Sequence, residues 1–200
     1  MSIRATIIPI LLLVLPGYNA VRADVLDDIT RRLNSNGEVT GRFVQYKHIP
    51  SIDRALESNG KFIYSRIAGI TWEVLQPFPS SIIIDSGGST IVDGKRVAGT
   101  GQALIMLDIF NSLSNNESRP ITANFLISGE VDDNGWRLVL KPKSSPLAKY
   151  IRRVTLIGDD VIRSIYINES NNAITTIDFS EIHPLQPEQG HVVNDETPVN

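Results

Sequence analysis

Three histidines are the side chains best suited to metal binding or acid–base catalysis in this sequence of 200 residues, and they lie far apart. His48 ends a predicted strand, His183 precedes a proline and His191 lies near the C-terminus, so no pair has the spacing of a zinc site. The chain has no cysteine, which excludes thiolate metal sites, disulfides and thiol nucleophiles. Serine-hydrolase and phosphate-loop motifs are also missing from the sequence. We therefore expect no metal, no cofactor and no enzymatic activity.

Two acidic segments could suggest a calcium loop or a catalytic carboxylate pair. The segment Asp132–Gly135 lacks the spaced acidic ligands and the distal glutamate that a calcium loop needs. Asp159 and Asp160 follow a glycine between two predicted strands. We predict that both segments are turns.

Arg66 is a cation whose spacing places it in line with aromatic side chains. In a strand predicted over residues 60–66 it shares one face with Phe62 and Tyr64, and Trp72 follows in the next strand. If that face points inward, Arg66 is a cation at the edge of an apolar interior. Alternatively, its stem lies on the rim of the sheet and its guanidinium stays in water. The residues alone leave both alternatives open.

A helix is predicted over residues 102–113, with an unusually broad apolar surface. Leu104, Leu107 and Phe110 recur at helical spacing, and the apolar residues between them widen the arc beyond half of the circumference. The segment is either an ordinary core helix or a lid over the open side of a curved sheet.

Residues 1–23 are predicted to be a cleaved secretory signal peptide. Arg4 supplies the positive charge, residues 7–15 form an apolar core, and Val21 and Ala23 are small residues at the cleavage site. The apolar run is far shorter than the roughly 20 residues that a transmembrane helix needs. We therefore expect the mature chain, from Asp24 onward, in the periplasm.

Charge and composition narrow the class of protein further. The formal net charge of −3 and the pI of about 5.6 argue against a nucleic-acid-binding protein, which usually has a basic face. With 42% hydrophobic and 20% charged residues, the composition is that of a folded globular protein. We expect one domain over residues 24–184, followed by a weakly ordered tail over residues 185–200.

Short strands separated by turns dominate this domain. Ile70, Trp72 and Val74 alternate with Thr71 and Glu73, as in a strand with one covered face. The strands are predicted at residues 41–48, 60–66, 70–75, 81–85, 124–130, 136–141, 151–157, 161–167 and 173–182, with a type I′ hairpin around Asp93-Gly94 in residues 91–97. A first helix is predicted at residues 24–34, and residues 114–120 are predicted to be a polar loop.

These elements predict a mainly β fold of the α+β type. Two helices cannot cover both faces of about ten antiparallel strands, so the sheet should curl into a barrel or an unclosed half-barrel with helices as its lid. The interior would then be apolar, and either a filled core or a ligand cavity.

Several spaced motifs resemble the LolA family of periplasmic outer-membrane lipoprotein carriers. Gly60, Arg66, Trp72 and Pro77 match the family's run of glycine, arginine, tryptophan and proline in order and spacing. Further matching segments are residues 41–45, 69–72, 135–143 and 177–180. The resemblance extends over nearly all of residues 24–184.

This resemblance implies a half-barrel whose apolar cavity takes the acyl chains of a lipoprotein or another lipidated cargo. It implies that Arg66 is the latch that hydrogen-bonds the lid helices. It also implies an inner-membrane export complex and an outer-membrane acceptor as partners, with no nucleic acid, and we expect a monomer. The residues expected to bind the cargo are Phe43, Phe62, Tyr64, Ile70, Trp72, Leu104, Leu107 and Phe110.

The sequence also departs from the family pattern near the latch. Ile67 stands where the family has a proline, and Ile70 stands at an aromatic position. The segment Gly69–Trp72, followed by Pro77 and Phe78, is more similar to a LolA-like branch associated with lipid or polyene biosynthesis and export. The cargo is therefore a lipoprotein or another hydrophobic molecule. A non-enzymatic scaffold of an envelope complex, with a packed interior, is the alternative function.

Overall fold

The computed structural model describes residues 21–34, 38–87, 89–97, 109, 112–113, 119–143 and 147–186, and its main element is one antiparallel sheet. Eleven strands follow the order β6-β5-β4-β3-β2-β1-β11-β10-β9-β8-β7, so β6 and β7 are opposite edges of an unclosed sheet. The expected fold class, an open antiparallel sheet with few helices, is confirmed.

The elements follow one another along the chain with short connections. They are α1 (Val21–Asn34), β1 (Val39–His48), β2 (Leu56–Ser65), β3 (Gly69–Gln76), β4 (Ser80–Ile84), β5 (Thr90–Val92), β6 (Lys95–Val97), α3 (Arg119–Asn124), β7 (Phe125–Asp132), β8 (Gly135–Pro142), the 3-10 helix η1 (Leu147–Lys149), β9 (Ile151–Gly158), β10 (Ile162–Glu169) and β11 (Ile174–Pro184).

Most strand predictions are confirmed, and the β5–β6 hairpin shows why. Asp93 and Gly94 have φ angles of 48° and 76°, the positive pair that a type I′ turn requires. The predicted polar loop over residues 114–120 is wrong at its end, where α3 begins at Arg119. Ile121 of this short helix is fully buried, so packing stabilises a helix that the local residue types do not predict.

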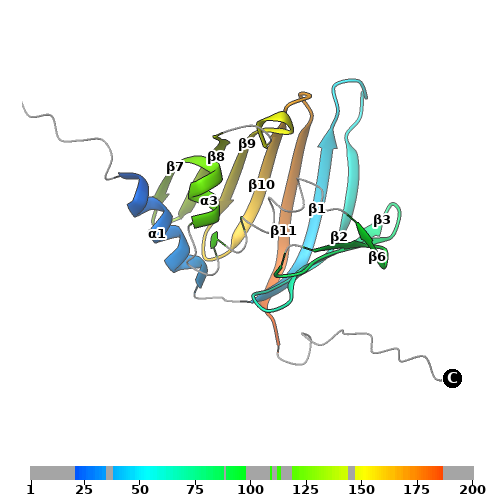
Figure 1. The fold of residues 1–200 in the computed structure, drawn as a ribbon, viewed down its shortest axis with the longest axis horizontal. Coiled ribbons are helices and arrows are strands. Elements are labelled where there is room, and N and C mark those ends of the chain that lie inside the picture. The colour runs from blue at the N-terminus through cyan, green and yellow to red at the C-terminus, as the bar shows by residue number, and fades with distance from the viewer. Residues whose placement is uncertain are drawn as a thin grey trace, which may run out of the picture.

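The sheet is curved, and the helices lie at one end of it. In Figure 1, β7–β11 run side by side, whereas β3 and β6 are steeply inclined to them. Both α1 and α3 pack on the edge strand β7. The side chain of Val25 lies against Gly129 of β7, which pairs with Leu138 of β8. The helices therefore cover the same face of the sheet as the buried side chain of Leu138.

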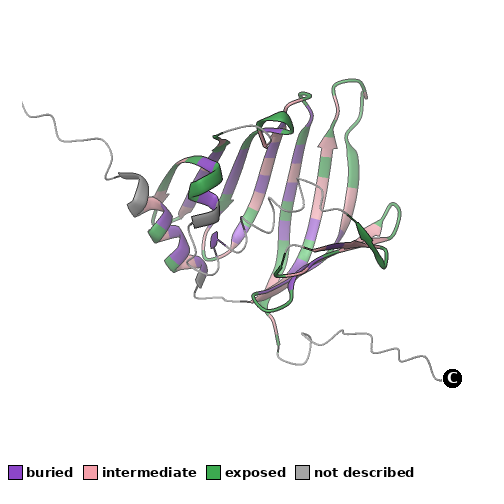
Figure 2. Cartoon of the chain, viewed as in Figure 1, coloured by how far each residue is buried: buried purple, intermediate pink, exposed green. Residues whose placement is uncertain are grey.

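This covered face carries the hydrophobic core, and we call it the inner face. Pairing places Phe43 opposite Phe179, and Leu138 opposite Leu156, on this face. Strands β8–β11 carry long buried stretches in Figure 2, where β2 and β3 are mostly half-buried or exposed. The described helix residues in the core are Leu26, Ile29, Leu33, Ile109, Leu113 and Ile121.

Candidate functional site

Four aromatic rings form a cluster on the inner face where β3, β2, β1 and β11 lie next to one another. The rings of Phe43 and Trp72 stack with their centroids 3.8 Å apart. Phe62 and Trp72 each pack edge-on or tilted against their neighbours, and Phe179 meets both of them at 5.0 and 6.0 Å. Such pairs add about 0.5–1.5 kcal/mol each beyond the area that they bury. We call Phe43, Phe62, Trp72 and Phe179 the aromatic cluster.

Two glycines make this close packing possible. Gly41 pairs with Phe62, and Phe43 pairs with Gly60, so that each ring lies beside a residue without a side chain. A Cβ atom on Gly60 would lie 1.8 Å from the carbonyl oxygen of Glu73 and 2.9 Å from the ring of Phe43. A Cβ atom on Gly41 would lie 2.8 Å from the ring of Phe62. Both positions therefore require glycine because of close approach, independently of any unusual backbone angle.

The members of the aromatic cluster differ in exposure. Phe43, Phe62 and Phe179 are buried, whereas Trp72 is half-buried. Its neighbours on the inner face, Val74 of β3 and Ile82 of β4, are also half-buried. An apolar strip on β3 and β4 therefore continues from the cluster and keeps part of its surface accessible.

The structure brings together five of the eight residues that we expected to bind cargo. Phe43, Phe62 and Trp72 belong to the cluster, and Tyr64 and Ile70 pair with each other next to it on the inner face. Tyr64 and Ile70 are buried. Leu104, Leu107 and Phe110 lie outside the described residues. What these side chains bind stays a prediction.

The helix predicted over residues 102–113 can be followed at three positions. Ile109, Ser112 and Leu113 are helical and fully buried. Ile109 and Leu113 belong to the hydrophobic core. At these positions the segment packs as a core helix does, and its role as a lid stays a prediction.

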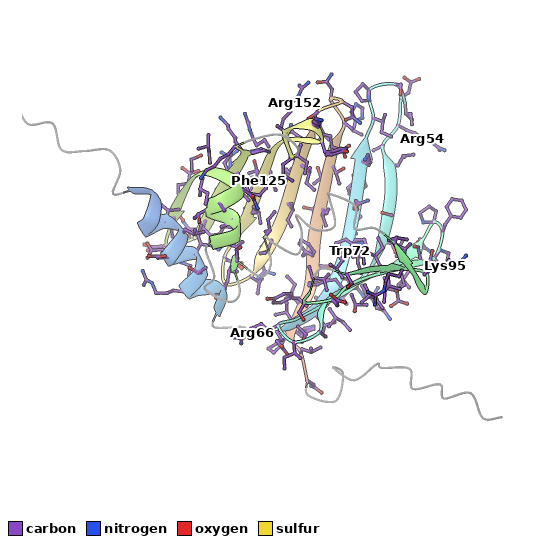
Figure 3. The ribbon with its side chains drawn as sticks, in the orientation of Figure 1. Arg54, Arg66, Trp72, Lys95, Phe125 and Arg152 are labelled. Atoms are coloured by element: carbon purple, nitrogen blue, oxygen red, sulfur yellow. The ribbon has the colours of Figure 1, made fainter. Side chains whose placement is uncertain are left out.

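Arg66 lies outside the strand in which its parity placed it. Strand β2 ends at Ser65, and Arg66 begins an exposed turn (Figure 3). The carboxylate of Glu38 accepts hydrogen bonds from the Ser65 hydroxyl and the Arg66 backbone N–H, at 2.9 and 2.8 Å. This contact fixes a turn before Gly69, so the alternation of the strand stops one residue early. The inward-facing alternative is therefore wrong, the rim position agrees with the structure, and the latch role stays a prediction.

One ion pair lies on the inner face, at the opposite end of the strands from Arg66. The ammonium of Lys47 lies 2.7 Å from Oε1 of Glu169, whose side chain is only 7% exposed. The hydroxyl of Thr175 donates to the same oxygen at 3.1 Å. Lys47 pairs in register with Thr175 of β11, which pairs with Ile167 of β10. Two more polar side chains, Gln45 and Ser58, pair with each other just before Lys47.

Sequence reasoning missed Phe179 and this ion pair. Phe179 shares its parity with the buried Ile177, a signal that could have placed it on the inner face. No local signal links Lys47 to Glu169, because the two residues lie on strands that meet only through β11.

The acidic segments are turns, as predicted. Asp132 accepts hydrogen bonds from the backbone N–H groups of Asn134 and Gly135 in the β7–β8 hairpin. Burial alone would raise the pKa of Asp159, but hydrogen bonds from Arg163 and the Val161 N–H outweigh it and hold that pKa below its ordinary 3.8. These carboxylates therefore stay charged and fix turns.

Two searches of the described residues bear on metals and membranes. No three histidine, aspartate or glutamate side chains gather there into a group able to hold a metal ion. None of the helices in those residues combines the length and hydropathy needed to cross a bilayer.

Comparison with known proteins supplies a family. A sequence profile described as "Outer membrane lipoprotein carrier protein LolA" matches residues 35–190, well over half of the chain. Comparison with curated proteins gives no match.

Several solved structures are similar in fold. The LolA superfamily protein NE2245 from Nitrosomonas europaea is 11% identical over 85% of this chain and 97% of its own, with a TM-score of 0.45. LprF from Mycobacterium bovis is 11% identical over 84% of this chain and 97% of its own, with a TM-score of 0.38. The Pseudomonas aeruginosa MucA/MucB complex matches at 10% identity over 82% of this chain and 59% of that chain, with a TM-score of 0.44.

Proposed function

The chain belongs to the LolA family, and from this premise we propose that it carries acyl chains across an aqueous compartment on the inner face of its sheet. The cargo is a lipoprotein or another lipidated molecule that moves through the periplasm toward the outer membrane. An inner-membrane export complex would deliver the cargo and an outer-membrane acceptor would receive it. The protein acts by binding and not by catalysis.

The observation that carries this proposal is the strip of half-buried apolar side chains beside the aromatic cluster. Trp72, Val74 and Ile82 line this strip. An acyl chain laid on it would leave water with a gain of about 0.8 kcal/mol for each CH₂ group buried. Strands β3 and β4 hold the strip in place through regular pairing, so no part of the sheet must unfold to bind a chain.

Loading must also be reversible, because a carrier releases what it binds. A lid competes with cargo for the same apolar surface, so a tightly packed lid would oppose loading. We assign this competing role to the segment over residues 102–113, with Arg66 as a latch. Arg66 lies in an exposed turn, where hydrogen bonds of its guanidinium to a lid can be exchanged for bonds to water.

Adjacent isoleucines on β4 offer a matched test. Ile82 points to the inner face and Ile83 to the outer face, where it is exposed. We expect Ile82→Ser to weaken the binding of a fluorescent acyl-chain probe about tenfold, because it removes apolar contact and places a hydroxyl under the chain. Ile83→Ser should leave the affinity unchanged. Titration of the probe into each folded variant measures this, and equal affinities in both would contradict the proposal.

One observation favours the alternative function, a non-enzymatic scaffold of an envelope complex. Three rings of the aromatic cluster are already buried, and Phe43 stacks directly on Trp72, as in a packed core. A scaffold with this interior would bind no acyl probe saturably, so the same titration on the wild-type protein separates the two functions.

A further inference from the structure

The inner face changes character along its strands. On β1, the apolar side chain of Phe43 is followed on the same face by Gln45 and then Lys47, about 13 Å further along the strand. The neighbouring strands change in the same direction. We call the five polar residues of this region the polar end; they are Gln45, Lys47, Ser58, Glu169 and Thr175.

The two charges of the polar end are unequally placed. Glu169 is nearly buried and is held by the Thr175 hydroxyl as well as by Lys47. The Lys47 side chain keeps 30% of its surface exposed. An ammonium has three N–H donors, and Oε1 of Glu169 accepts one of them. An approaching molecule therefore meets the cation of the pair first.

The polar end is also open to solvent. Leu56 pairs with Lys47 across β1 and β2 and is 46% exposed, whereas Phe43 on the same face is 1% exposed. An acyl chain gains nothing by covering a charged pair, because it would take the ammonium out of water without replacing its hydrogen bonds. A molecule that spans both regions must therefore have an apolar part and a polar part.

We propose that the polar end binds an anionic headgroup and thereby orients the cargo, with Lys47 donating to a carboxylate or phosphate oxygen while the acyl chain lies on the aromatic cluster. This inference rests on the proposed carrier function and adds a direction and a chemical class to it. The ligand is an amphiphile whose headgroup has an anionic oxygen. Glu169 holds the ammonium in place when no ligand is bound and competes with the headgroup for it.

Three probes with the same sixteen-carbon chain test this proposal: hexadecanoate, hexadecyl phosphate and the uncharged hexadecanol. Lys47→Met should weaken the binding of the two anions about tenfold, the loss typical of one charge-assisted hydrogen bond, and leave hexadecanol unchanged. Glu169→Gln should instead strengthen the binding of both anions several-fold, because it removes the competing carboxylate. The ratio of the two anions distinguishes a carboxylate from a phosphate headgroup. Calorimetric titration measures all three affinities.

Controls separate this effect from folding and from overall charge. Lys47→Met leaves the buried Glu169 without its cation, so the double variant Lys47→Met/Glu169→Gln shows whether a neutral pair folds and still binds anions weakly. Lys47→Arg should restore anion binding. Lys61 lies on the exposed outer face of β2, and Lys61→Met should change none of the three affinities.

The outcomes are distinct. Opposite shifts for Lys47→Met and Glu169→Gln on the anions alone support the proposal, because a purely structural pair would weaken all probes in both variants. Parallel loss of all three probes overturns it, as does an equal effect of Lys61→Met. Binding of all three probes with no change in any variant overturns the headgroup site and leaves the carrier function standing. Binding of none by the wild-type protein overturns both.

Discussion

The two halves of the sheet differ in how completely their inner faces are covered. On β8–β10 the inner-face side chains of Leu138, Leu156 and Ile165 are fully buried. On β3–β5 the corresponding side chains of Trp72 and Ile82 are only half-buried (Figure 2). The same alternating pattern builds both halves, and the helices α1 and α3 pack at the β7 edge, beside the first half.

This difference indicates a division of labour within one sheet. The β7–β10 half holds the fold together, because its apolar area is already removed from water. The β2–β5 half, with the aromatic cluster and the half-buried strip, keeps apolar area that a further molecule can cover. A mutation in the first half should therefore change stability, and a mutation in the second should change binding.

The largest expected effect is in the covered half. Leu138→Ala should lower the free energy of unfolding by about 2–5 kcal/mol, because it leaves a cavity among fully buried neighbours. Urea denaturation measures this loss. The affinity of the folded variant for an acyl probe should stay within about twofold of the wild type, a change of less than 0.5 kcal/mol. Lost affinity in fully folded Leu138→Ala would show that the two halves are not separate.

The two tryptophans allow the same substitution in each half. Trp72→Leu should lower the free energy of unfolding by about 1 kcal/mol, the scale of its ring–ring contacts, and weaken acyl binding several-fold. Trp136 is buried on β8, and its Nε1 donates to the Asp159 carbonyl at 2.6 Å. Trp136→Leu should therefore cost more stability and leave acyl affinity unchanged. Denaturation and probe titration on both variants decide this, and matching binding losses would refute the division.

The smallest expected effect concerns Asp159 at a turn of the covered half. Its lowered pKa means that the folded state favours the charged form, so its contribution to stability is present above pH 3.8 and is lost as the pH falls through the lower folded value. Because the carboxylate is 42% exposed, Asp159→Asn should cost only about 0.5 kcal/mol at pH 7. The difference from wild type should vanish in acid denaturation. A difference that persists at low pH would contradict this assignment.

Local patterns in the sequence were sufficient for most of the fold. The alternation of Ile70, Trp72 and Val74 predicted a strand with one covered face, and Asp93-Gly94 predicted a type I′ hairpin, because both depend on backbone geometry within a few residues. Helix α3 was not predictable in this way. Its residues Arg119–Asn124 are polar except at Ile121 and Ala123, and burial of Ile121 against the rest of the core stabilises it.

The candidate site was predictable in part for the same reason. Phe43, Phe62 and Trp72 were found because each has apolar parity within its own strand. Arg66 was assigned to β2 because parity does not show where a strand ends, and the end depends on the Glu38 carboxylate that holds the turn.

The sequence by itself determined which residues of each strand share a face, where the tight turns lie and which chemistries are absent from the chain. Only the tertiary structure decided which strands are neighbours, and thus that Phe179 meets Phe62 and that Lys47 meets Glu169. The physical reason is that side-chain alternation is a local property of the backbone. Register between strands more than one hundred residues apart depends instead on the packing of the whole sheet.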